Sequence, residues 1–287
     1  MVKAYVYLLA AAFFWGTSFV AGKYAFDFAD PVIVVLFRFL IASAFWFPKV
    51  NFPRLSFQNN MKLVFISFLI IPATFLLQFI GLKYTSASSA AIMIGFEPLM
   101  IVFMGWLIWK ERPSLLSILF AFIALIGVVL VIGWPSDAKF LGSTLVLLST
   151  VIVAIWVRWS KKWMSMLGVK TFTALTTIVG TFLLIPFAIV FVENWAITYS
   201  WSGLLAILYL GIGCSLFANW AWNNGISNVS ANVGGLFLSL EPIFGIIIAS
   251  YLLQELLTTQ MVIGAALVIF PVVISALIAL FSSKTRD

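Results

Sequence analysis

The chain is 287 residues long, with 64% hydrophobic and 9% charged residues and a net charge of +7 at pH 7. Soluble domains carry about a quarter charged residues, so this composition excludes a soluble fold and predicts a polytopic membrane protein. Because the basic residues fall in predicted loops, where they set membrane orientation, nucleic-acid binding is not expected. A single cysteine, Cys214, excludes a disulfide framework within the chain.

Ten apolar runs follow one another along the chain, each long enough for a membrane-spanning helix of about 20 residues. The predicted spans are 4–25, 30–48, 61–82, 86–109, 114–134, 141–160, 171–192, 200–222, 229–252 and 259–281. The first run follows Lys3 and has some features of a signal peptide. It is too long for the apolar region of one and lacks a convincing cleavage site, so we expect an uncleaved first span.

The Lys and Arg residues in the loops and near the ends of the predicted spans are distributed unevenly between the two sides of the membrane. With a cytoplasmic N-terminus, the opposite side receives only Lys23, Lys83 and Lys139. The positive-inside rule therefore predicts that both termini are cytoplasmic. The basic residues placed on the cytoplasmic side are Lys3, Lys49, Arg54, Lys62, Lys110, Arg112, Arg158, Lys161, Lys162, Lys170, Lys284 and Arg286.

The stretch that begins at Lys83 recurs in weaker form 144 positions later, near Gly225. Because 144 residues contain five predicted spans, an odd number, the two copies enter the membrane from opposite sides. We therefore predict an all-α membrane protein in which residues 1–139 and 140–287 are inverted five-helix repeats around a central cavity. A duplication that only lengthens the bundle is the alternative. The aligned pairs are Ser86 with Ser230, Ala87 with Ala231, Glu97 with Glu241, Pro98 with Pro242 and Glu111 with Glu255.

Glu97 and Glu241 each precede a helix-breaking proline, Pro98 or Pro242, near the middle of an apolar span. A carboxylate at this depth is costly unless it is paired or neutralised. One interpretation is that both glutamates line the cavity, where they bind a proton or a substrate ammonium group; this makes them candidate proton-coupling residues. The other is that each satisfies backbone groups freed at the helix break. The two interpretations are compatible.

Arg38 and Trp15 are predicted at the same depth as the two glutamates. Arg38 should point inward, either as a structural ion-pair partner or as a direct ligand. Trp15 and Trp156 lie deep in the first helix of their halves, where an aromatic wall can pack against an apolar or cationic substrate group. Gln78 and Asn219 either line an entrance or are ordinary interfacial residues.

Two further groups of residues are predicted to have structural roles. Small residues at spacings of four favour close helix packing over ligand contact; they are Ser86, Ala87, Ala90, Ala91, Ser230, Ala231, Gly234 and Gly235. Tryptophans near the ends of spans are typical of an interfacial belt; they are Trp106, Trp109, Trp134, Trp195, Trp201 and Trp222.

The segments FFWGTSFVAGK, LFRFLIA, GLKYTSASSAAIMIGFEPLMIVFMGWLIWKERPSL and SLEPIFGIIIASYLLQELLTTQMVIGAALVI resemble the EamA type of the drug/metabolite transporter superfamily. The resemblance implies a ten-helix carrier of the bacterial inner membrane, with substrates that range from amino acids to sugars, nucleosides and quaternary ammonium compounds. The second half departs from the pattern, because Trp156 is followed by VRWSKK without a Gly-Thr-Ser step. The positions matched by resemblance are Trp15, Gly16, Ser18, Arg38, Tyr84, Glu97, Trp156 and Glu241.

The sequence thus predicts a secondary transporter that exports a small polar or zwitterionic metabolite, foremost an amino acid, by alternating access. Its expected partners are the lipid bilayer, a small-molecule substrate and, as a candidate coupling ion, the proton. Neither a cofactor nor a metal is expected, and no Walker loop is present. The alternatives are a carrier of another small solute, in uptake or exchange, and a channel or receptor. An intramembrane enzyme is remote, since the chain has no His and no hydrolase motif.

Overall fold

The computed structural model describes residues 2–50, 52–112, 114–132, 138–229, 234 and 237–284. Every regular element in these ranges is helical, which confirms the predicted all-α class. Seven helices are long and apolar enough to cross a membrane, and they span Val2–Ala25, Pro31–Lys49, Phe57–Tyr84, Ala87–Trp109, Lys139–Leu167, Val169–Phe191 and Trp201–Ile226. Three shorter apolar helices cover Leu115–Val131, Glu241–Leu252 and Thr259–Ile274.

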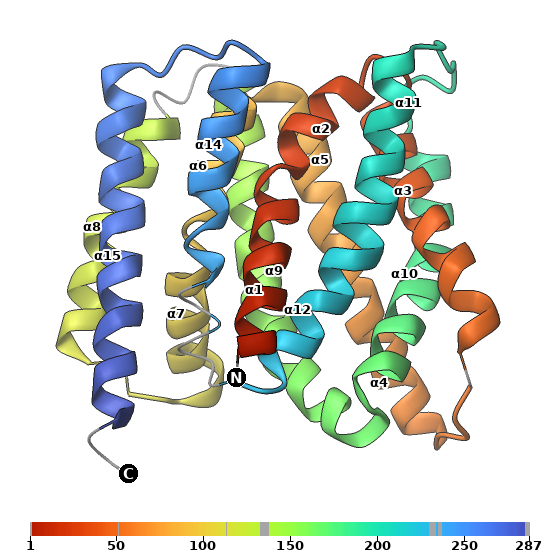
Figure 1. The fold of residues 1–287 in the computed structure, drawn as a ribbon, viewed down its shortest axis with the longest axis horizontal. Coiled ribbons are helices and arrows are strands. Elements are labelled where there is room, and N and C mark those ends of the chain that lie inside the picture. Colours follow the sequence, from red (N-terminus) through yellow and green to blue (C-terminus); the bar gives the residue numbers. More distant parts are fainter. Residues whose placement is uncertain are drawn as a thin grey trace.

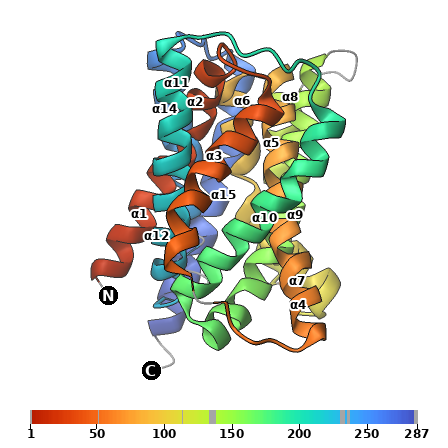
Figure 2. The same ribbon diagram turned by 90° about the vertical axis from the view of Figure 1, so that its right-hand side faces the viewer.

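The chain passes repeatedly from one end of the bundle to the other, in several passages through two consecutive helices, and the N- and C-termini lie at the same end (Figures 1 and 2). We call this the terminal end, and the other the distal end. The elements are α1 Val2–Gly16, α2 Ser18–Ala25, α3 Pro31–Trp46, η1 Phe47–Lys49, α4 Phe57–Phe68, η2 Leu69–Ala73, α5 Thr74–Tyr84, α6 Ala87–Ile94, α7 Glu97–Trp109, α8 Leu115–Ile132, α9 Ala138–Leu167, α10 Val169–Phe191, α11 Trp201–Leu208, η3 Tyr209–Phe217, α12 Ala218–Ile226, α14 Glu241–Leu252 and α15 Thr259–Lys284.

The largest departure from the predicted bounds is at α9, which continues to Leu167 although the apolar run predicts an end near residue 160. Lys161 and Lys162 therefore lie on a helix and not in a loop. The continuation has a physical reason: Trp163 and Met164 are buried, so this last part of α9 is amphipathic and packs one face on the bundle.

Helix boundaries in the two halves repeat at the spacing found in the sequence. The pairs α4 and α11, α5 and α12, α7 and α14, and α8 and α15 each begin 144 residues apart. Lys110 and Gln254, also 144 apart, both have left-handed backbones, with φ of 56° and 53°. The loop after α7 lies at the terminal end, whereas the loop after α14 lies at the distal end, so these two helices run in opposite directions (Figure 1).

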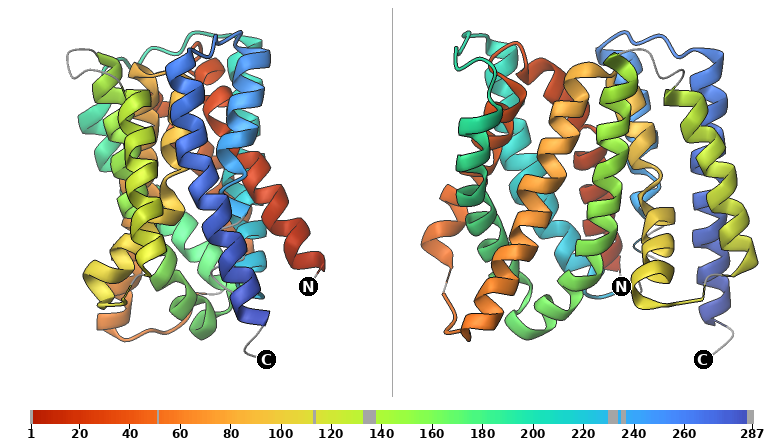
Figure 3. Two further views of the ribbon diagram at one scale, coloured as in Figure 1. Left: turned by 90° about the vertical axis from the view of Figure 1, so that its left-hand side faces the viewer. Right: turned by 180° about the vertical axis from the view of Figure 1, so that it is seen from behind.

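The helices of the two halves are interleaved. Helix α3 packs on α10, α6 on α14, α1 on α12, α5 on α9 and α8 on α15. The α8 and α15 pair forms one edge of the bundle, away from α3 and α10 at the other edge (Figures 1 and 3). The elements between these edges enclose the buried polar residues described next.

Candidate functional site

Interrupted helices meet at the centre of the bundle. Glu97 begins α7 after a turn that follows α6, and Glu241 begins α14. A Cβ atom on Gly95 would lie 3.1 Å from Pro242 Cγ, and one on Gly16 would lie 2.5 Å from the Glu241 carbonyl oxygen. Such close approach requires glycine at position 16, where a side chain would collide with backbone, and leaves little room for a side chain at position 95. It brings the starts of α7 and α14 together beside the break between α1 and α2.

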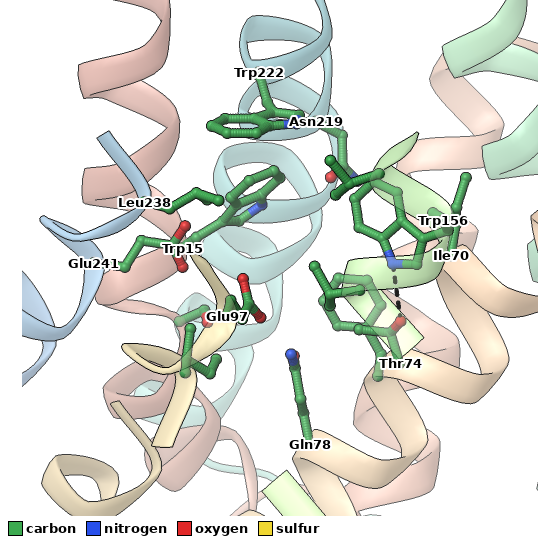
Figure 4. Close-up of a pocket in the computed structure, with 15 residues that line it drawn as sticks. Trp15, Ile70, Thr74, Gln78, Glu97, Trp156, Asn219, Trp222, Leu238 and Glu241 are labelled. Carbon is green, nitrogen blue, oxygen red and sulfur yellow. Dashed lines mark hydrogen bonds between the residues drawn. The ribbon is translucent and has the colours of Figure 1, made fainter. Parts of the chain in front are cut away.

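A cavity of about 50 Å³ lies at this meeting point (Figure 4). This volume has room for a few water molecules, since one water needs roughly 10–15 Å³. The structure places seven of the ten candidate site residues around it, namely Trp15, Ser18, Gln78, Glu97, Trp156, Asn219 and Glu241. The other lining residues are Ile70, Thr74, Phe75, Ile94, Val153, Val157, Trp222 and Leu238.

The two carboxylates are the only ionisable groups among these lining residues. Glu97 and Glu241 are 5% and 4% exposed, and no hydrogen bond to either carboxylate is formed by the described residues. Neither the break before α7 nor that before α14 is capped by a side chain. Each glutamate lies in the first turn of the helix that follows its break, where the helix dipole favours a negative charge, so both interpretations of these residues stay predictions. No group of metal ligands occurs in the described part of the chain.

Trp15 and Trp156 occupy opposite sides of the pocket, and each indole N–H is anchored on the other half of the chain (Figure 4). Trp15 Nε1 donates to the Cys214 carbonyl in η3 at 3.1 Å, and Trp156 Nε1 donates to Thr74 Oγ1 at 3.2 Å. Both acceptors lie in or beside a π-helical stretch, where widened turns leave carbonyls free. The Thr74 hydroxyl donates in turn to the Leu69 carbonyl, at 2.7 Å. These bonds fix the ring planes that line the cavity.

Trp222 is a lining residue that the interfacial-belt assignment misplaced. It is buried, and its ring centroid lies 5.4 Å from that of Trp15. The 144-residue repeat could have identified Trp222 as a cavity residue. It pairs Trp222 with Gln78, which also lines the cavity. Trp106, Trp195 and Trp201 are exposed, as a belt requires. Trp134 lies outside the described residues.

Arg38 lies outside the cavity lining and does not form the ion pair that its depth suggested. Its side chain is fully buried, and Nε donates to Ser215 Oγ at 2.7 Å. The guanidinium carbon lies 4.7 Å from the Phe75 ring centroid and 4.9 Å from that of Phe79. Its two terminal nitrogens have no hydrogen-bond partner in the described structure. Aromatic faces thus replace the expected carboxylate.

Gly16 and Tyr84 are likewise not part of the cavity lining. Gly16 serves the close contact between α1 and α14, where a side chain would collide with backbone. Tyr84 ends α5 at the distal end, where its hydroxyl donates to Glu193 at 3.4 Å beside an ion pair of 2.6 Å between Lys83 and Glu193. This ion pair holds the pKa of the Glu193 carboxyl below its ordinary value.

A smaller cavity of about 20 Å³ adjoins the first on the side of the terminal end. It shares Trp156 and Asn219 with the larger cavity and adds the hydroxyl-bearing face of α10 at Thr173, Thr176 and Thr177. Asn223 Nδ2 donates to Thr173 Oγ1 at 2.9 Å. The two cavities are separate, and their polar side chains follow one another from the glutamates toward the terminal end.

At the distal end, hydrogen bonds join the two halves. The Glu255 carboxylate accepts from the backbone N–H of Ala87 at 2.8 Å and of Ser88 at 2.9 Å, in the first turn of α6. The Tyr24 hydroxyl donates to the Leu252 carbonyl at 2.8 Å. A carboxylate is favoured at a helix N-terminus because the first N–H groups have no partner within the helix.

Glu111, the counterpart of Glu255 in the repeat, has a different partner. Arg158 donates to both of its carboxylate oxygens, with Nη2 and Oε2 2.6 Å apart, and the guanidinium lies over the Trp109 ring. The hydrogen bond from Arg158 is the main reason why the pKa of Glu111 is lowered. Equivalent glutamates thus hold the ends of the two halves in different ways.

A helical bundle with seven helices able to span a bilayer and a polar site at its centre defines an integral membrane protein. The EamA-like transporter family model matches residues 2–133 and 140–277, and the chain belongs to this family. The family predicted from the sequence is thereby confirmed.

Several curated relatives bear transporter names. An uncharacterized transporter of Haemophilus influenzae is 36% identical over 141 residues, which cover 47% of this chain and 83% of the relative. An uncharacterized transporter of Archaeoglobus fulgidus is 26% identical over 95% of this chain and 98% of its own. The uncharacterized transporter YyaM of Bacillus subtilis is 26% identical over 94% of this chain and 92% of its own. A protein of known crystal structure, 18% identical, has a TM-score of 0.71 over 96% of this chain and 98% of its own, which shows a shared fold.

Proposed function

We propose that the chain is a secondary transporter for small solutes that bear an ammonium group, with amino-acid export across the bacterial inner membrane as the leading case. The observation that carries this proposal is the convergence of Glu97 and Glu241 on a cavity walled by Trp15 and Trp156. Carboxylates attract an ammonium group, and indole faces add cation–π attraction. In an amino acid, the substrate carboxylate would bind the amide of Gln78, which points toward Glu97 (Figure 4).

A second candidate is a carrier of amines or quaternary ammonium compounds that have no carboxylate. The specific observation in its favour is that no Lys or Arg occurs among the described residues that line the cavity. The carboxylate of a zwitterionic substrate would find only uncharged hydrogen-bond donors in this cavity. Comparison of an amino acid with its decarboxylated amine therefore separates the two candidates.

The proposed architecture is ten membrane-spanning helices in two inverted repeats, residues 1–139 and 140–287. It is supported by the 144-residue spacing of helix starts, by the opposite directions of α7 and α14, and by family matches in both halves. In such repeats the two halves exchange conformations and expose a central site to each side in turn. The distal end, which we place outside the cell, would be closed here by the contacts of Glu255 and Tyr24.

Movement of the substrate would also require the cavity to enlarge. A space of about 50 Å³ fits water but not an amino acid, so the side chains that separate the two cavities must move apart. Protonation of Glu97 or Glu241 would remove the charge that holds an ammonium group. We propose this exchange of proton for substrate as the coupling step.

The experiment that tests the proposal is counterflow in proteoliposomes. Vesicles loaded with an unlabelled amino acid should accumulate the labelled one, whereas a channel gives flux that trans-side substrate does not accelerate. Glu97→Gln and Glu241→Gln, singly and together, should abolish proton-driven accumulation and its pH dependence. Asp27→Asn is the control, because Asp27 is an exposed carboxylate at the distal end. Unchanged accumulation and pH dependence in the glutamate variants would refute proton coupling.

A further inference from the structure

A lateral groove of about 480 Å³ lies between the first turns of α4 and the last turns of α9. These turns lie at the terminal end of the bundle (Figure 2). Its polar side chains are Lys62, Lys162 and Asn59. The remaining wall consists of aromatic rings and thioethers, with Phe65 and Trp159 in ring contact at 5.9 Å. The groove is separate from the central cavity and shares no lining residue with it.

The positive charge in this groove is not compensated within the described structure. Lys62 and Lys162 are both exposed, and neither forms an ion pair with a described acidic side chain. The two ion pairs that are present involve other basic residues, Lys83 and Arg158. The groove is therefore lined by two ammonium groups that have no acidic partner among the described residues.

The apolar wall of the groove is also uncovered. Met61, Phe65 and Met166 are each at least half exposed, and Trp159 is 37% exposed. Lysines with tryptophan at the end of a membrane bundle are typical of the interface between headgroups and acyl chains. A ligand that pairs with the lysines and also covers the apolar side chains needs an anionic head and a hydrocarbon tail in the same molecule.

We propose that this groove binds an anionic phospholipid, with its phosphate between Lys62 and Lys162 and an acyl chain along Phe65 and Trp159. Basic pockets between helices on the cytoplasmic side of a membrane recognise anionic lipid headgroups. The positive-inside rule places the terminal end on that side. Free phosphate would use the lysines alone and leave the aromatic wall bare, so the lipid is the occupant that the groove fits.

A second groove provides an internal control. It lies between α7 and α8, has about 600 Å³, and is lined by apolar residues such as Phe103 and Trp106 with the single cation Arg112. Lys110→Gln with Arg112→Gln removes two positive charges from the same end of the bundle. Glutamine suits position 110, because Gln254 has the same left-handed backbone at the equivalent position.

The test measures thermal stabilisation of the full-length protein in neutral detergent by phosphatidylglycerol, cardiolipin and phosphatidylcholine. Both anionic lipids should stabilise the wild type at lower concentration than phosphatidylcholine. Lys62→Gln with Lys162→Gln should raise the half-stabilising concentration of the anionic lipids about thirtyfold, since each lysine near an anionic surface contributes roughly fivefold. Lys62→Arg with Lys162→Arg should retain the effect, which also shows that the positions tolerate substitution.

Three results would overturn the proposal. One is equal stabilisation by phosphatidylcholine. Another is an equal loss in the Lys110→Gln, Arg112→Gln control, which would indicate a general charge effect. The third is stabilisation of the same size by glycerol 3-phosphate, which would assign the groove to a soluble phosphate.

Discussion

The contact of Glu255 with the start of α6 makes a specific prediction about how the distal end opens. Glu255→Gln keeps the size of the side chain but replaces one carboxylate oxygen with an amide nitrogen, which cannot accept from the backbone N–H groups of Ala87 or Ser88. A hydrogen bond to a charged group contributes about 1.5–3 kcal/mol. Because Glu255 is half-buried, the lower value applies, and closure of the distal end should weaken by about tenfold.

The assay is thiol labelling from outside intact cells with a membrane-impermeant reagent. The native Cys214 is fully buried and is replaced by alanine, and Gln78→Cys then reports access to the cavity. Glu255→Gln should raise the labelling rate about tenfold, whereas Asp27→Asn, at the same end, should leave it unchanged. An unchanged rate in Glu255→Gln would show that this contact does not hold the distal end closed.

Other contacts give three shorter predictions. Gly16→Ala should lower the melting temperature, because its Cβ would lie 2.5 Å from the Glu241 carbonyl oxygen and overpacking costs about 1–3 kcal/mol; unchanged melting would contradict this packing. Trp156→Phe should lower transport about fivefold through loss of one hydrogen bond of about 1 kcal/mol, and full activity would show that the indole N–H is dispensable. The pKa of Glu111 is lowered from 4.5 by Arg158, so this ion pair contributes stability that is present above the ordinary pKa and is lost as pH falls through the lowered one. The melting-temperature difference between wild type and Glu111→Gln should therefore shrink below about pH 4.5; a difference that grows in acid would refute the assignment.

The apolar runs predicted an all-helical membrane bundle, and the resemblance of four segments to a known family predicted the family. They did not predict the π-helical stretches η2 and η3. In η2, Pro72 lacks the N–H that a regular helix needs, so a widened turn is understandable. In η3 no proline is present; this stretch packs against Phe14, whose carbonyl accepts from the Cys214 thiol. Tertiary contacts of this kind are not encoded in hydrophobic periodicity.

Depth and chemistry together mark Glu97 and Glu241, and both line the central cavity, while their role in transport stays a prediction. Depth alone does not give the rotation of a helix about its axis, which decides whether a side chain meets the cavity or its neighbours. Arg38 therefore lies among phenylalanine rings behind the cavity wall, and Trp222 lines the cavity although its place near a span end indicated the interface. The rotation of a helix is normally inferred from the contrast between its polar and apolar faces. Because these helices are apolar on nearly all sides, the sequence does not show which face meets the cavity.

The central claim is that two equivalent glutamates form one binding site for an ammonium-bearing solute. Its most direct test is ligand-induced thermal stabilisation of the purified protein, with a panel of amino acids, amines, sugars and nucleosides. Ligands with an ammonium group should raise the melting temperature of the wild type, and Glu97→Gln or Glu241→Gln should remove the shift. Stabilisation by sugars or nucleosides alone, or a full shift in the double variant, would contradict the claim.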